Sequence, residues 1–125
     1  MEDKKIDNKI IQTKKEIKII EDDLTRTKKA LKEIEYLEDN ITHLNRNLNQ
    51  CVELINLSIK NKNVSQKINT ISNDTIINYK KTSLSINEEK EITTKKINEL
   101  NEKKELLNDE LKKINEEKEE NKEQE

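Results

Sequence analysis

The chain has 125 residues, of which 42% are charged and 30% are hydrophobic, with two Tyr and no Phe, Trp, Gly or Pro. Globular domains are about 25% charged and about 45–50% apolar, so this composition excludes a thick hydrophobic core. It leaves long helices that share a narrow apolar contact, or disorder.

Charge and hydropathy also exclude two kinds of partner. The formal net charge is −2, no long block of like charge occurs, and aromatic residues that could stack on bases are scarce, so we expect no nucleic-acid binding. No apolar run approaches the ~20 residues that cross a bilayer, and the start, "MEDKKIDNKIIQTKKE", lacks a signal-peptide pattern. We therefore expect a cytoplasmic protein without a membrane partner, and any secretion by a route that is independent of a signal peptide.

The first predicted element is a long helix, arm one, over about residues 4–59. Apolar and small residues recur there at alternating steps of three and four, the spacing of a coiled coil, over about six heptads. A disordered chain does not keep a regular spacing of apolar residues over this length, so the pattern favours a helix. The positions that we assign to the contact between helices, the hairpin seam, are in this arm Ile17, Leu24, Leu31, Leu37, Leu44, Cys51 and Ile55.

A polar gap, "KNKN" at residues 60–63, separates the two apolar patterns. Asn is a poor helix former and tolerates the left-handed conformation, so we predict a turn at 60–63. Asn63 or Ser65 is a candidate cap for the next helix. The polar stretch "TISNDT" at 70–75 leaves open a broader turn that extends over 60–75.

The second predicted helix, arm two, covers residues 64–118 and carries a less regular seam. Lys90 and Lys104 occupy seam positions, where the aliphatic stem can pack while the ammonium group reaches water. The final residues, 119–125, are strongly acidic and predict a frayed, solvated tail. The seam residues in this arm are Ile68, Tyr79, Ile86, Leu100, Leu107 and Ile114.

Folding the chain about the gap places apolar residues of the two arms opposite each other. Leu44 then meets Tyr79, and Leu24 meets Leu100. The predicted fold is therefore all-α, a long antiparallel two-helix hairpin of the coiled-coil kind. The alternative is one continuous helix that pairs with copies of itself, as in a structural scaffold, phage or cytoskeletal protein.

Additional apolar residues lie off the seam of arm one and widen its apolar stripe beyond what one partner helix covers. We interpret them as a docking surface for a third helix, with ordinary exposed apolar residues as the alternative. Tyr36 lies between acidic residues and is a further candidate contact. This candidate partner interface comprises Ile11, Ile19, Tyr36, Val52, Leu54 and Leu57.

No set of residues predicts catalysis, metal binding or a cofactor. His43 is the single histidine, and Cys51 is the single cysteine, so neither has the further ligands that a metal site needs. We expect a solvated His43 and a Cys51 that packs as a small apolar side chain. A phosphate-binding loop requires Gly, which the chain lacks, and the prediction is a protein that is not an enzyme.

Two segments, "ALKEIEYLEDNITHLNRNLNQCVELIN" (30–56) and "NYKKTSLSINEEKEITTKKINELNEKKELL" (78–107), resemble a family. In shape and composition they are similar to the small helical-hairpin accessory proteins associated with LXG toxins of Gram-positive type VII secretion, which are like WXG100 hairpins. The resemblance implies a chaperone-like adaptor that binds the helical targeting domain of a toxin, with a second small helical protein as a further partner. The chain has no Trp or Gly and so lacks the WXG motif itself, and a partner would supply any export motif of this kind.

Overall fold

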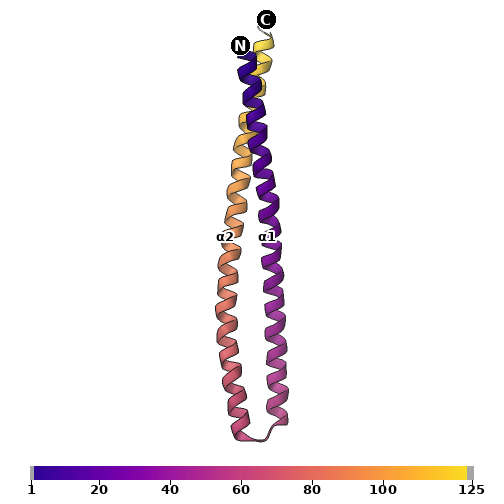
Figure 1. Cartoon of the computed structure of the whole chain (residues 1–125), viewed down its shortest axis with the longest axis vertical. Helices are drawn as coiled ribbons and strands as arrows, with labels where there is room; N and C mark the ends of the chain where they lie inside the picture. Colours follow the sequence, from indigo (N-terminus) through magenta and orange to yellow (C-terminus); the bar gives the residue numbers. More distant parts are fainter. Residues whose placement is uncertain (1, 124–125) are drawn as a thin grey trace. The chain divides into compact units, whose positions relative to one another are not determined.

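The computed structural model describes residues 2–123 and contains two long helices. Helix α1 spans Glu2–Ser58 and helix α2 spans Lys62–Glu123, and the two pack against each other as an antiparallel pair (Figure 1). Residues 2–123 include no strand. The predicted all-α hairpin is thus confirmed, and a single continuous helix is excluded because the chain leaves the helical conformation after Ser58.

The turn is shorter than predicted and lies slightly earlier, at residues 59–61. The Asn61 side-chain oxygen accepts a hydrogen bond from the Asn63 backbone N–H at 3.0 Å, and the Asn61 carbonyl accepts from the Ser65 N–H at 3.0 Å. This is the geometry of a helix N-cap, so the cap is Asn61 and the assignment to Asn63 or Ser65 is wrong. The described residues have no positive φ, and the turn closes without a left-handed residue.

We expect Asn61→Ala to lower the free energy of unfolding by about 1 kcal/mol, because it removes the side-chain acceptor of the N-cap. Asn63→Ala is the matched control. Its side chain lies beyond the cap, and Ala is a better helix former, so the variant should keep or slightly raise stability. Urea unfolding followed by circular dichroism measures both, and equal losses in the two variants would contradict the assignment of Asn61.

Two further expectations are corrected by the course of α2. The helix continues through residues 70–75, so the broad turn over 60–75 is wrong. The Thr70 and Thr75 hydroxyls donate to the carbonyls of Gln66 and Ile71 at 3.0 and 2.8 Å, so these polar side chains are satisfied within the helix. The expected frayed tail is also wrong for residues 119–123, which are helical, and residues 124–125 lie outside the described part.

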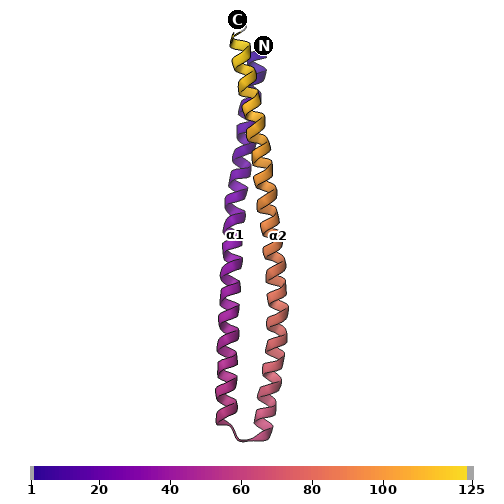
Figure 2. The same cartoon turned by 180° about the vertical axis from the view of Figure 1, so that it is seen from behind.

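The chain divides into two compact units, each made of one segment from each helix. The terminal unit consists of Met1–Ala30 with Thr93–Glu125, and the turn unit is Leu31–Ile92. Figure 2, the view from behind, shows in the turn unit the end of α1 beside the start of α2, joined by the short loop. Each unit is treated separately below.

The terminal unit holds every side chain that is buried among residues 2–123. Leu24 is 5% exposed and Leu100 is 8% exposed, and these two residues of different helices were predicted to face each other. The Thr27 hydroxyl, also buried, donates to the Asp23 carbonyl at 2.7 Å, so its polar group is satisfied inside the helix. The full buried set is Ile6, Thr13, Ile17, Leu24, Thr27, Leu100 and Ile114.

Ion pairs between the helices lie in both units. In the terminal unit, Lys118 Nζ lies 2.6 Å from Asp7 Oδ1, and Lys104 Nζ lies 3.5 Å from Glu21 Oε1. In the turn unit, Lys90 Nζ lies 3.5 Å from Glu38 Oε1. Lys90 and Lys104 are thus half-exposed, as their predicted seam positions allow, and the ammonium group of each lies beside a Glu carboxylate of α1. Each of these partly exposed ion pairs contributes about 0–1 kcal/mol to the free energy of unfolding, so together they add little to the stability of the hairpin.

Candidate functional site

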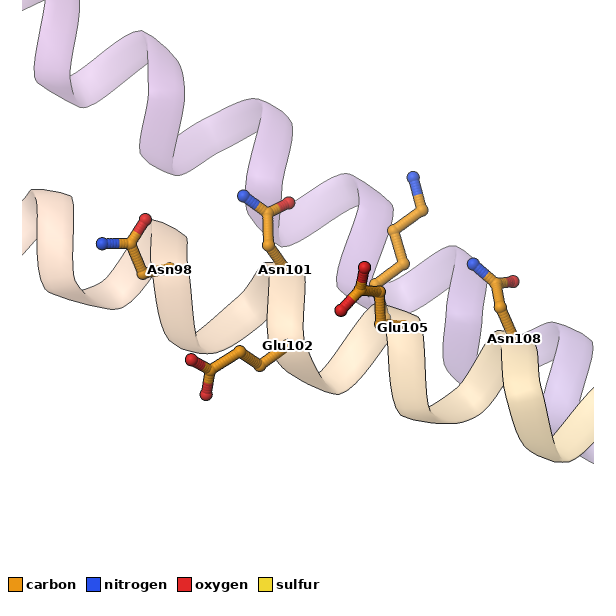
Figure 3. A pocket seen from close by; sticks show the side chains of 6 residues that line it. Asn98, Asn101, Glu102, Glu105 and Asn108 are labelled. Carbon is orange, nitrogen blue, oxygen red and sulfur yellow. The ribbon is translucent and has the colours of Figure 1, made fainter.

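The His, Cys, Asp and Glu side chains of residues 2–123 do not gather into a metal site. His43 is exposed, as expected, and no group of three or more His, Cys, Asp or Glu between residues 2 and 123 is placed to hold a metal ion. A polar depression on α2 of the terminal unit is drawn in Figure 3. Its side chains are amides, carboxylates and the amine of Lys104, which already contacts Glu21, so this depression is an open charged surface. It is lined by Asn98, Asn101, Glu102, Lys104, Glu105 and Asn108.

The turn unit differs from the terminal unit because its apolar residues are largely exposed. None of its residues, 31–92, is buried, whereas 12 of the 15 large hydrophobic residues found exposed in residues 2–123 belong to it. The other three, in the terminal unit, are Ile11, Ile19 and Leu106. A concentration of exposed apolar side chains in one part of a chain is typical of an interaction site.

An open groove of about 200 Å³ lies between the helices of the turn unit. Leu44 and Tyr79, which were predicted to face each other, both line this groove. Leu44 is 60% exposed, so the groove is an accessible surface and not an enclosed cavity. Its lining residues are Ile41, Leu44, Asn45, Leu48, Thr75, Asn78, Tyr79 and Thr82.

Four seam residues of α1 in the turn unit were expected to be buried between the helices. This expectation is wrong for Leu37, Leu44, Cys51 and Ile55, which are exposed, although Leu44 still lines the groove beside its predicted neighbour Tyr79. The residues one position later than the first three, Glu38, Asn45 and Val52, are half-buried in their place.

The physical reason lies in the opposite face of α2. The half-buried residues of α2 in this unit are in part large, at Ile68, Ile76, Tyr79, Ile86 and Lys90, and in part small and polar, at Ser65, Ser72, Thr75 and Ser83. At the small polar positions a Leu on α1 finds few atoms to pack against. An exposed hydrogen bond of 3.2 Å from Asn56 Nδ2 to Asn69 Oδ1 also joins the two helices in this unit.

The other seam residues divide between the units. In the terminal unit the seam is buried or half-buried at Ile17, Leu24, Leu100, Leu107 and Ile114. In the turn unit it is at most half-buried, at Leu31, Ile68, Tyr79 and Ile86.

Asn45, which lines the groove, has a buried side-chain oxygen without a hydrogen-bond donor. A buried acceptor without a donor costs about 1–3 kcal/mol. Hydrophobic spacing does not reveal such a residue, because Asn45 lies directly beside the Leu44 that the heptad pattern selects.

The sequence around the groove is unusually poor in charge. Residues 40–81 contain six basic and two acidic residues, a net charge of +4, although the whole chain is 42% charged with a net charge of −2. Ten of its residues are Asn. Depletion of charge together with exposed apolar side chains is typical of the core of a protein–protein interface.

The candidate partner interface from the sequence is exposed except at Val52, which is half-buried. Leu57 is 82% exposed and Tyr36 is 68% exposed, so both are accessible to a partner. Ile11 and Ile19 belong to the terminal unit, and Tyr36, Leu54 and Leu57 belong to the turn unit. The groove residues Leu44 and Leu48 were missed as candidates for the partner interface, because their heptad spacing assigned them to the contact between the helices.

Comparisons with protein-family models, with curated proteins and with solved structures found no match to this chain. Neither helix, over the residues described, has a stretch that is long and apolar enough to span a membrane.

Proposed function

We propose that this chain is a non-enzymatic helical adaptor that binds another helical protein through its turn unit. The observation that carries the proposal is the contrast between the two units. The terminal unit buries its apolar seam, whereas the turn unit leaves most of its large apolar residues exposed, and two of these, Leu44 and Leu48, line a groove between the helices. A surface of this kind gains stability only when another apolar surface covers it.

The energies involved support a partner that contacts more than the groove. Full burial of a large apolar side chain contributes about 1.5–3 kcal/mol, so covering the four partly exposed apolar residues of the groove, Ile41, Leu44, Leu48 and Tyr79, contributes on the order of 3–6 kcal/mol. Association itself costs an estimated ~4–15 kcal/mol. The groove alone therefore supports weak binding, and exposed residues outside it, such as Tyr36, Leu54 and Leu57, provide additional contact area for a tighter complex.

The resemblance of segments 30–56 and 78–107 to the accessory proteins of LXG toxins supplies the identity of the proposed partner. That partner is the helical targeting domain of a toxin exported by type VII secretion, and the adaptor's role is to cover apolar surface of that domain before export. The low charge of residues 40–81 supports a protein partner.

The test is co-expression of the chain with the targeting domain of an LXG toxin encoded beside its gene, followed by affinity purification and size-exclusion chromatography. We expect a stable complex, and stronger protection of amides 31–92 from hydrogen exchange than in the free chain. A chain that elutes alone and folded while the targeting domain is present in excess contradicts the proposal.

A further inference from the structure

We propose that the turn unit has a second, less populated arrangement, in which α1 is turned by about 50° about its own axis and α2 covers the other edge of its apolar stripe. In the described arrangement one row of α1 residues is half-buried against α2, the inner row of Glu38, Asn45 and Val52. The row beside it is exposed, the outer row of Leu37, Leu44 and Cys51. The second arrangement exchanges the two rows and so hides the outer row from a partner.

The spacing of α1 allows both arrangements. The two rows flank a central row, which consists of Ile41, Leu48 and Ile55. Combined with the central row, either flanking row steps by three and four along the chain and forms a complete heptad seam. Successive residues are about 100° apart around a helix, so the flanking rows lie about 50° to either side of the central row. A turn of about 50° therefore exchanges the flanking rows and keeps the central row near α2.

The face of α2 toward α1 carries partners for the outer row. Leu44 and Tyr79 already line the same groove between the helices. Continuing the antiparallel pairing of these two residues places Leu37 at the level of Ile86, and Cys51 at the level of Ser72. Ile86 and Ser72 are both half-buried, which is expected of residues on the side of α2 that faces α1.

Opposing contributions keep the two arrangements close in free energy. The described one leaves Asn45 Oδ1 buried without a donor and Leu44 exposed, and the turn would reverse both. Against this, the turn would draw Glu38 away from Lys90, whose Nζ lies 3.5 Å from Glu38 Oε1. It would also overwind α1, because two consecutive steps of three lead to the outer row, from Leu31 through Ile34 to Leu37. These costs make the second arrangement the less populated one.

The exchange of rows would regulate the surface that the proposed function uses. In that respect the inference rests on the proposed function, since the turn determines whether Leu44 is accessible to a partner. The turn itself is a property of the chain alone and is tested without a partner.

The experiment measures disulfide formation in the full chain between position 72 of α2 and three positions of α1. Ser72→Cys alone tests the natural Cys51 of the outer row. Two comparison chains combine Ser72→Cys and Cys51→Ala with either Val52→Cys, in the inner row, or Leu54→Cys. Leu54 belongs to none of the three rows and is 65% exposed. Initial rates with oxidised glutathione are followed by mass spectrometry at low protein concentration, which separates crosslinks within one chain from those between chains.

We expect position 52 to form the crosslink fastest, and position 51 to form it at least about threefold faster than position 54. The reaction of position 51 proceeds through the second arrangement, so its rate is proportional to the population of that arrangement. A rate at position 51 that does not exceed the rate at position 54 overturns the inference.

Asn45→Leu distinguishes an exchange of rows from a single arrangement in which Cys51 simply lies near α2. An apolar side chain in the inner row favours the described arrangement, so the rate at position 51 should fall at least about threefold while the rate at position 52 is kept. Asn47→Leu is the matched control, because Asn47 is exposed and belongs to none of the three rows. Circular dichroism verifies that the variants are folded. A rate at position 51 that Asn45→Leu leaves unchanged overturns the inference.

The crosslinked chains separate this inference from the proposed function. We expect the chain that is locked between positions 51 and 72 to bind the targeting domain at least about tenfold more weakly than the chain locked between 52 and 72. Equal binding overturns the regulatory role and leaves the adaptor function standing. Crosslinking rates as expected, with no form of the chain that binds the domain, support the turn of α1 and contradict the toxin as partner.

Discussion

Leu24→Ala is expected to lower the free energy of unfolding by about 2–4 kcal/mol, one of the two largest effects we predict for this chain. The Leu24 side chain is 5% exposed and belongs to the small buried set of the terminal unit. Its truncation loses apolar burial and leaves space that two helices fill only in part. Leu100→Ala, at a site that is 8% exposed on α2, should cost a similar amount.

The control is Leu44→Ala, the same substitution at a residue that is 60% exposed. Here little burial is lost, and Ala is the better helix former, so the change should stay below about 1 kcal/mol. Urea unfolding with a common slope for all variants measures the differences. A cost at Leu44 as large as that at Leu24 would show that the turn unit is packed in solution and would remove the basis of the proposed binding surface.

The second large effect concerns hydrogen exchange in the free chain. We expect backbone amides of residues 62–90 in α2 to exchange at least about tenfold faster than those of residues 97–114, although both segments belong to one helix. Segments that bury few apolar contacts open locally at low free energy, and none of residues 31–92 is buried whereas Leu100 and Ile114 are.

Mass spectrometry of peptides from the exchanged chain gives this comparison directly. Within α1, amides 34–56 compared with amides 13–27 provide an independent measurement of the same contrast. Uniform protection along both helices would mean that the turn unit is as stable as the terminal unit without a partner. Addition of the partner should slow exchange in the turn unit far more than in the terminal unit.

The amino-acid sequence by itself determined the fold class and the place of the reversal to within a few residues. From residue 10 onward, successive apolar residues are three or four positions apart, a spacing that only helices turn into one apolar face. The polar gap after Ile59 separates two such patterns of similar length and marks the reversal. Leu24 and Leu100 were correctly placed in the buried seam, because in the terminal unit apolar residues of one arm face apolar residues of the other.

Only the tertiary structure decided which face of α1 meets α2 in the turn unit. Leu44 and Asn45 differ by one position, or about 100° around the helix, and the heptad pattern selects Leu44. The structure instead half-buries Asn45 and exposes Leu44 in the groove, where small polar side chains such as Thr75 interrupt the apolar residues on the half-buried face of α2. Periodicity in one helix fixes an apolar stripe, but the residues that face it from the other helix determine which edge of that stripe is covered and which is left for a partner.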